Sequence, residues 1–121
     1  MLPELDIEFL EDKGYDYQLV PHTSGVYLII NQFEFGDAYQ PNVASLLINV
    51  ISGYPDNPLD MFWTSPDVKL VDGNWPKAGD VHEMYNDASW QRWSRHYIWR
   101  SGIDNIRTFI AAVKQEIAKG I

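Results

Sequence analysis

The residues with the greatest capacity for chemistry lie together in the second half of the chain, in the run Ser89-Trp90-Gln91-Arg92-Trp93-Ser94-Arg95-His96. Ser89 and Ser94 carry hydroxyls that could act as nucleophiles. A serine hydroxyl needs a neighbouring base for this role, and His82 or His96 could supply one. These two serines and two histidines are therefore the candidate catalytic residues.

A structural interpretation of the same run competes with the catalytic one. Residues 89–97 have the spacing of a short helix, in which Trp90, Trp93 and Tyr97 would share one face. Ser89 would then be the N-cap, with its hydroxyl accepting from free backbone amides. The cap interpretation is favoured over the nucleophile, and both stay open.

Tryptophan and arginine are concentrated in this half of the chain. All four arginines lie between Arg92 and Arg107, and all five tryptophans follow residue 62. Both residue types are enriched in binding hot spots, and arginine recognises carboxylates. Alternatively, the tryptophans belong to the core and the arginines pair with the protein's own acids. The candidate partner-binding residues are Trp90, Gln91, Arg92, Trp93, Arg95 and Arg100.

One short segment has the residue types of a metal site. His82 stands between Asp80 and Glu83, but no second histidine has the spacing of a ligand. We therefore expect no metal ion and no other cofactor.

Length and composition are typical of a single folded domain over residues 1–121. The 45% content of hydrophobic residues argues against disorder, and the length is sufficient for a core. The sequence contains no cysteine, so a disulfide, a thiolate metal site and a thiol nucleophile are all excluded.

The net charge of −8 argues against nucleic acid or an anionic membrane as the main partner. No apolar run approaches the roughly 20 residues that span a bilayer. The first residues carry acids instead of the basic and apolar segments of a signal peptide. We expect a cytoplasmic protein.

The candidate residues must be positioned by elements whose periodicity is readable. Apolar spacing predicts a helix over residues 3–13, and alternation predicts strands over 15–21, 26–35, 43–51 and 59–64. Antiparallel pairing of successive strands would make a four-stranded meander. Residues 66–88 lack periodicity and are predicted to be a long irregular loop, which is often functional.

A second amphipathic helix is predicted over residues 101–119. Ser101 would be its N-cap, with Asp104 as a partner resembling that of a capping box. An apolar stripe from Ile103 to Ile117 would pack on the sheet, and Gly120 would end the helix. The fold class is therefore α+β, with a short N-terminal helix, an antiparallel meander and a C-terminal helix.

The third and fourth predicted strands are joined by a corner, because Pro55 and Pro58 cannot donate to a sheet ladder. An aromatic residue before Pro55 raises the proportion of the cis form, but trans is the expected form.

A strand, a Tyr-Pro corner and a strand that ends in Ser-Pro resemble the corresponding stretch of ubiquitin-conjugating enzymes. Trp99 followed by an amphipathic helix also has a counterpart in those enzymes. The closer resemblance is to the prokaryotic ubiquitin-conjugating-enzyme-like family E. It rests on Glu8-Phe9-Leu10, Tyr54-Pro55-Asp56, Leu59-Asp60-Met61-Phe62 and the run from Ser89 to His96.

This resemblance implies a shortened ubiquitin-conjugating fold and a role in a bacterial ubiquitin-like modification system. The implied partners are a ubiquitin-like protein, its activating enzyme and a JAB-type peptidase of the same pathway. The common ubiquitin-conjugating enzymes accept the modifier on a cysteine, about eight residues before the tryptophan that precedes the helix. Counting back from Trp99 leads to Gln91, which is no nucleophile. The usual His-Pro-Asn is absent too, and Asn74-Trp75-Pro76 is its nearest counterpart.

Two functions follow from the missing cysteine. In the favoured one, the protein docks the modifier or its activating enzyme without carrying the modifier. In the alternative, it is a conjugating enzyme that carries the modifier as an oxyester on Ser89 or Ser94.

Overall fold

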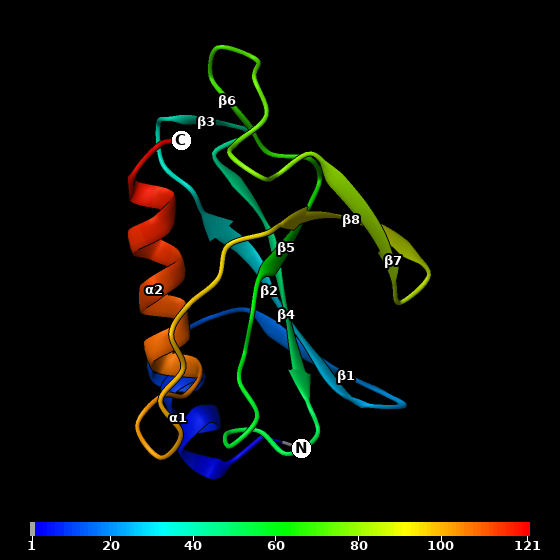
Figure 1. Cartoon of the computed structure of the whole chain (residues 1–121), viewed down its shortest axis with the longest axis vertical. Coiled ribbons are helices and arrows are strands. Elements are labelled where there is room, and N and C mark those ends of the chain that lie inside the picture. Colours follow the sequence, from blue (N-terminus) through cyan, green and yellow to red (C-terminus); the bar gives the residue numbers. More distant parts are fainter. Residues whose placement is uncertain (1) are drawn as a thin grey trace.

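The computed structural model describes residues 2–121, and these residues form two helices packed on one side of a six-stranded antiparallel sheet (Figure 1). A pair of two-residue strands forms a small second sheet. The elements in chain order are α1 (Glu4–Asp12), β1 (Tyr17–His22), β2 (Gly25–Glu34), β3 (Tyr39–Gln40), β4 (Val43–Ile51), β5 (Phe62–Ser65), β6 (Lys69–Leu70), β7 (Val81–Tyr85), β8 (Ala88–Trp93) and α2 (Ile106–Ala118).

The predicted meander is present. β1, β2, β4 and β5 are neighbours in this order, and all of their pairings are antiparallel. β4 begins at Val43 and ends at Ile51, as its apolar alternation predicts, while β5 starts three residues later than expected. The α+β class, the N-terminal helix and the C-terminal helix are confirmed.

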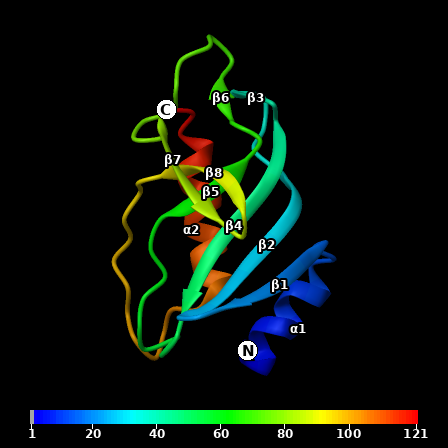
Figure 2. The same cartoon turned by 90° about the vertical axis from the view of Figure 1, so that its right-hand side faces the viewer.

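The sheet continues beyond the meander, because residues 81–93 form a hairpin that the sequence analysis missed. β8 pairs with β5 and β7 pairs with β8, which gives the order β1-β2-β4-β5-β8-β7 (Figure 2). Asn86 and Asp87 make the turn with φ of 51° and 59°, the left-handed pair that a tight hairpin requires. The predicted irregular loop over residues 66–88 is therefore wrong at β6, at β7 and at the start of β8, while most of residues 66–80 have no regular structure.

The predicted helix over residues 89–97 is also wrong. Trp90 and Trp93 are three residues apart, which places them on one face of a helix but on opposite faces of a strand. In β8, Trp93 packs in the main core under α2, while Trp90 packs with Trp63 on the other face. Each face of the sheet thus receives one tryptophan from the same strand.

The core between the sheet and the helices is built from the inward side chains of β2 and β4 and from the apolar stripe of α2. Ile106, Phe109, Ile110, Val113 and Ile117 are all buried there. This confirms the predicted stripe except at its first member, because the Ile103 side chain is 60% exposed.

α2 begins five residues later than the predicted helix. Asn105 is the N-cap, and its side chain accepts from the Thr108 amide while the Thr108 hydroxyl accepts from the Asn105 amide. Ser101 and Asp104 are therefore not the cap pair. Gly120, with φ of 67°, follows the C-cap Lys119, as predicted for the helix end.

Replacing the observed cap residue should lower stability more than replacing the cap residue that the sequence predicted. Asn105→Ala removes the acceptor for a free amide of α2 and should lower the free energy of unfolding by about 1 kcal/mol. Ser101→Ala leaves the cap intact and should change it by less than about 0.5 kcal/mol. Urea unfolding followed by circular dichroism measures both, and a larger loss in Ser101→Ala would contradict the observed helix start.

Candidate functional site

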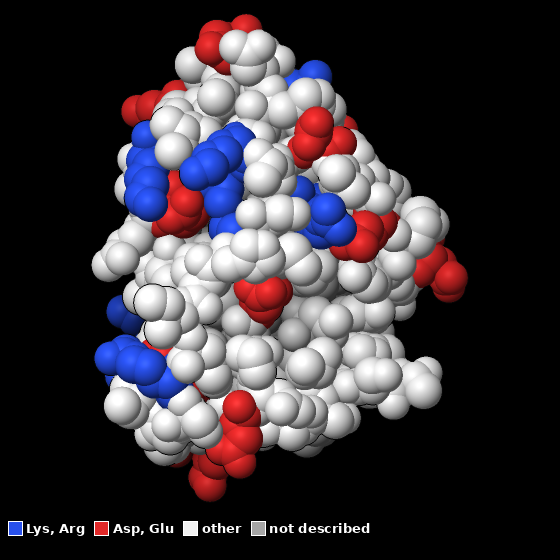
Figure 3. All heavy atoms as spheres, viewed as in Figure 1, with Lys and Arg blue, Asp and Glu red and all other residues white. Residues whose placement is uncertain are grey.

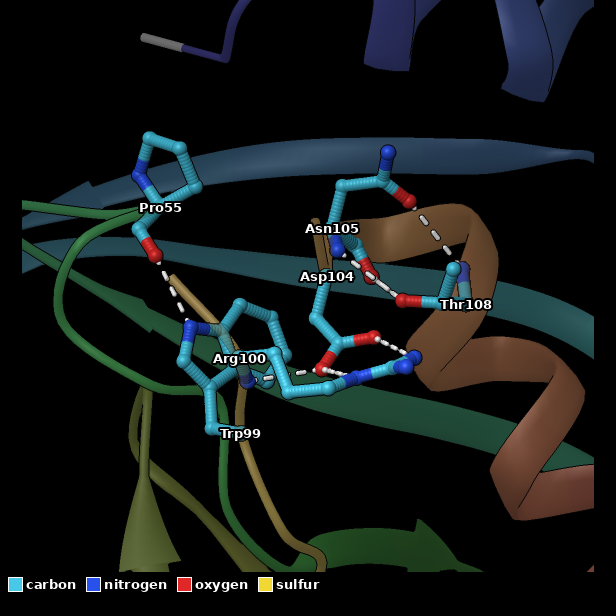
Figure 4. Close-up of polar contacts among 6 residues, drawn as sticks. All are labelled: Pro55, Trp99, Arg100, Asp104, Asn105 and Thr108. Atoms are coloured by element: carbon cyan, nitrogen blue, oxygen red, sulfur yellow. Dashed lines mark hydrogen bonds and ion pairs between the residues drawn. The ribbon is translucent and has the colours of Figure 1, made fainter. Parts of the chain in front are cut away.

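The segment between β8 and α2, residues 94–105, runs beside the Tyr-Pro corner and is called the connecting segment below. The indole of Trp99 donates to the carbonyl of Pro55 at 2.8 Å (Figure 4). The Ser101 hydroxyl donates to an Asp56 carboxylate oxygen at 2.7 Å. The Tyr54-Pro55 bond is cis, where the sequence favours trans. These contacts hold two segments, more than forty residues apart, side by side.

The corner is also joined to both helices by the hydroxyl of Tyr54. This hydroxyl donates to Asp6 of α1 at 2.7 Å and accepts from the amide of Ile106, the first residue of α2. Burial raises the pKa of both the Asp6 carboxyl and the Tyr54 hydroxyl above their ordinary values. The corner, α1 and the start of α2 therefore share one polar contact.

His96 and Asp60 form an exposed pair where the connecting segment leaves the sheet. Nδ1 of His96 lies 3.0 and 3.1 Å from the two carboxylate oxygens of Asp60. Nε2 of His96 has no hydrogen-bond partner among residues 2–121, and the side chain is 69% exposed. A carboxylate on Nδ1 orients the ring so that Nε2 could act as a base on an incoming group.

Ser94 is held in a different polar chain. Its hydroxyl oxygen accepts from Nε of Arg92 at 2.9 Å. The same arginine lies 3.5 Å from Glu83, whose carboxylate accepts from the Trp63 indole at 2.9 Å. This series of polar contacts lies on the outer face of β5, β7 and β8. The hydrogen-bond partner of the Ser94 hydroxyl is therefore an arginine and not a histidine.

Gln91, at the counted position of the missing cysteine, is fully buried. Its amide oxygen accepts from the Thr64 hydroxyl at 2.9 Å and from the Val68 amide. Its amide nitrogen donates to the carbonyls of Val68 and Gly79, both at 2.9 Å. All of the hydrogen-bonding capacity of this side chain is used within the fold.

Ser89 and His82 lie on the β7–β8 hairpin. Ser89 is exposed and pairs with Met84, while His82 pairs with Gln91 and bonds Asp67 at 2.7 Å. Within the described part of the chain, no hydrogen bond joins either candidate serine to either candidate histidine. The catalytic assignment of Ser89, Ser94, His82 and His96 stays a prediction.

The candidate partner-binding residues divide by exposure. The side chains of Trp90, Gln91, Trp93 and Arg95 are buried. Arg92 and Arg100 reach the surface, with 29% and 61% of their side chains exposed.

The arginines of this set pair with carboxylates of the chain itself. Their partners are Glu83 for Arg92, Glu116 for Arg95 and Asp104 for Arg100. Blue and red groups accordingly lie next to each other on the face shown in Figure 3. The guanidinium of Arg100 lowers the pKa of the Asp104 carboxyl (Figure 4).

The connecting segment also carries exposed apolar side chains that the sequence analysis did not single out. Ile98 is 92% exposed and Ile103 is 60% exposed. A surface hollow of about 460 Å³ lies between this segment and α2, and Ile98 and Arg100 contribute to its lining. The sequence indicates this exposure through three consecutive large apolar residues, Tyr97-Ile98-Trp99. In an extended chain successive side chains point to opposite sides, so all three cannot face the core.

A comparison with protein families settles the relationship of the chain. The profile of the prokaryotic E2 family E matches residues 2–120. The chain belongs to this family. Membership in prokaryotic E2 family E supports a role in ubiquitin-like conjugation and suggests interaction with a ubiquitin-like modifier and activating enzymes. No curated protein and no solved structure gives a significant match.

Within residues 2–121, this family E protein has no helix of the length and hydrophobicity needed to span a membrane.

The buried guanidinium of Arg95 is held by hydrogen bonds within the fold. Its guanidinium donates to the carbonyls of Lys77 and Ile121 and to the Glu116 carboxylate at 3.0 Å. Lys119 and Arg95 together lower the pKa of the Glu116 carboxyl below the ordinary value of 4.5. The stabilisation that comes from ionised Glu116 is therefore present above pH 4.5 and is lost as the pH falls through the lowered pKa.

Replacement of this carboxylate should affect both stability and its pH dependence. Glu116→Gln should lower the free energy of unfolding at pH 7 by about 1–3 kcal/mol, because buried Arg95 loses a charged partner. It should also flatten the fall in stability below pH 4.5. Urea unfolding between pH 3 and 7 measures both effects. Glu8→Gln on the exposed side of α1 is the control, and equal behaviour of the two variants would refute the role of the pair.

Proposed function

We propose that this family E protein docks the ubiquitin-like modifier or its activating enzyme and does not carry the modifier covalently. The observation that carries the proposal is the state of Gln91. The position counted for the acceptor cysteine holds a buried amide with four hydrogen bonds inside the fold. A residue in that state has no free atom to offer to a modifier.

The surroundings of the serines also support docking. The Ser94 hydroxyl oxygen accepts a hydrogen bond from the Arg92 guanidinium, and no base among the described residues accepts the proton of this hydroxyl. The Ser89 hydroxyl is exposed but has no histidine within hydrogen-bond distance among the described residues. An oxyester acceptor would require a base to approach one of them.

The docking surface that we propose is the exposed side of the connecting segment. Ile98 and Ile103 provide apolar area, and Arg100, which is 61% exposed beside its partner Asp104, provides a guanidinium next to the hollow against α2. An aliphatic residue next to an arginine suits the C-terminal tail of a ubiquitin-like protein, which ends in a carboxylate. Arg92, on the outer face of the sheet, is the second surface arginine that could take part.

The pathway that we infer is a bacterial, cytoplasmic modification system in which a JAB-type peptidase removes the modifier. This inference rests on membership in the family.

The second candidate function is oxyester formation on Ser89 or Ser94. The pair of His96 and Asp60 favours it, because Nε2 of an oriented imidazole has no partner in the described residues. Because Ser94 and His96 both lie in the connecting segment, the backbone between them would have to change conformation to bring this base to the Ser94 hydroxyl.

One reaction separates the two functions. The protein is incubated with its activating enzyme, the ubiquitin-like protein and ATP, and the products are run on a denaturing gel with and without hydroxylamine. Docking predicts no adduct at the size of a one-to-one conjugate. An adduct that resists thiol reductant, is cleaved by hydroxylamine and is missing in Ser89→Ala or Ser94→Ala would overturn the proposal and establish the oxyester.

Calorimetry of the same components locates the docking surface. Ile98→Asp and Arg100→Ala should each weaken binding by about tenfold or more, since central apolar and arginine contacts dominate interface energies. Met84→Asp, an equally polar change at an exposed residue of the hairpin, is the control and should bind normally. If the wild-type protein binds neither component, the proposal fails.

A further inference from the structure

A groove on the α1 side of α2 is not used by the proposed docking surface. It consists of two adjoining hollows of about 480 and 210 Å³, which share Tyr15 and Lys114. We call it the α1–α2 groove. Its lining includes the aromatic rings of Phe9, Tyr15 and Phe33 and the cations Lys13, Arg107 and Lys114.

The charge in this groove is uncompensated, in contrast to that of the arginines described above. Lys13, Arg107 and Lys114 make no ion pair with any of residues 2–121. The ammonium group of Lys114 lies 5.7 Å from the ring centre of Tyr15 and 6.0 Å from that of Phe33. A protein with a net charge of −8 has carboxylates to spare, yet none pairs with these three cations. An anionic ligand would complete them.

The groove also contains an open strand edge. The paired residues of β1 and β2 end at Tyr17 and Ile30, and one further backbone bond joins the Asn31 amide to the Asp16 carbonyl. β2 goes on to Glu34 and pairs there with β4 alone. The register shifts after Ile30, and Gln32 at the shift has a φ of 52°. Residues 32–36 line the larger hollow. Backbone groups on the unpaired side of this strand could accept an added extended chain.

The cations, the aromatic rings and the strand edge together indicate the kind of ligand. A free inorganic anion would use the cations but not the aromatic rings or the strand edge. An extended peptide with carboxylate side chains would use all three. Glu34 lines the groove at the strand end, so it would repel acids there and favour them beside Lys13, Arg107 and Lys114.

We propose that the α1–α2 groove binds an extended acidic segment of a partner protein. Carboxylates of the segment pair with Lys13, Arg107 and Lys114, apolar side chains contact Phe9, Tyr15 and Phe33, and the backbone lies along the open edge of β2. This surface is separate from the exposed side of the connecting segment. Only Arg107 and Ala111 line both the smaller hollow and the one beside that segment.

A phage-displayed library of random dodecapeptides, selected on the whole protein, tests the proposal. The selected peptides should be enriched in Asp and Glu, alternating with apolar residues. The consensus peptide, labelled with fluorescein, is then titrated with the protein, and amide chemical shifts should change at residues 32–36 and along α2. A selected pool without acidic enrichment, or shifts confined to other elements, would overturn the proposal.

Charge reversal provides the matched comparison. Lys114→Glu and Lys13→Glu should each weaken peptide binding by about tenfold, while Lys77→Glu, which also reverses an exposed cation without an ion pair in residues 2–121, should leave it unchanged. All three are checked for native circular dichroism. Equal loss in Lys77→Glu would indicate non-specific attraction, and equal displacement of the same resonances by inorganic phosphate alone would indicate a simple anion site; either result refutes the proposal. Lys13 and Lys114 do not line the hollow beside the connecting segment, so this test is independent of the docking proposed above.

Discussion

The hydrogen bonds of the Gln91 side-chain amide are the interactions on which the second half of the molecule depends. Its four hydrogen bonds join β8 to Thr64 of β5, to Val68 and to Gly79. Trp93 adds to the same centre, because its indole donates to the Thr64 hydroxyl at 3.0 Å. An unpaired amide in a dry core would cost about 1–3 kcal/mol, whereas one that is fully paired fixes the neighbouring chain. Residues 66–80, which have little regular structure, are thereby anchored to the sheet.

This centre also decides which residues of β8 reach each face of the sheet. Because Gln91 and Trp93 point into the core, the intervening Arg92 must point to the outer face, where it meets Glu83 of β7. Trp90 and Trp63 pack on that same face. Successive side chains of β8 thus point to opposite faces of the sheet. Gln91 and Trp93 lie in the core, while Trp90 and Arg92 lie on the outer face beside Trp63 and Glu83. The arginines that suggested a binding site mostly neutralise local acids.

Much of the fold was predictable from local pattern. Both ends of β4 were predicted correctly, because its nine residues are rich in apolar side chains and turn residues flank them on both sides. The stripe of α2 was equally clear, although its start was not. Ser101 and Asp104 have the types of a capping pair, but Asp104 instead accepts from the amide and guanidinium of Arg100. That choice depends on the path of the connecting segment past Pro55, which is a tertiary contact.

The hairpin and the site were harder to predict for physical reasons. Its turn is Asn-Asp and not the Asn-Gly that signals a tight hairpin, and the β7 sequence Val-His-Glu-Met-Tyr has no regular alternation of apolar and polar residues. Trp90 and Trp93 fit a helix face as well as they fit a strand. The sequence singles out the run from Ser89 to His96 by its residue types. It could not show that half of that run is buried, since burial is decided by strand pairing with β5 and β7.

The most direct test of this account is the exchange of the side-chain amide protons of Gln91 in the unmodified protein, measured by NMR in D₂O. The account predicts that these protons exchange at least about 100-fold more slowly than those of Gln115, which is exposed on α2. Equal exchange rates for the two glutamines would contradict it, because the side-chain amide of Gln91 would then be open to solvent and not held within the fold.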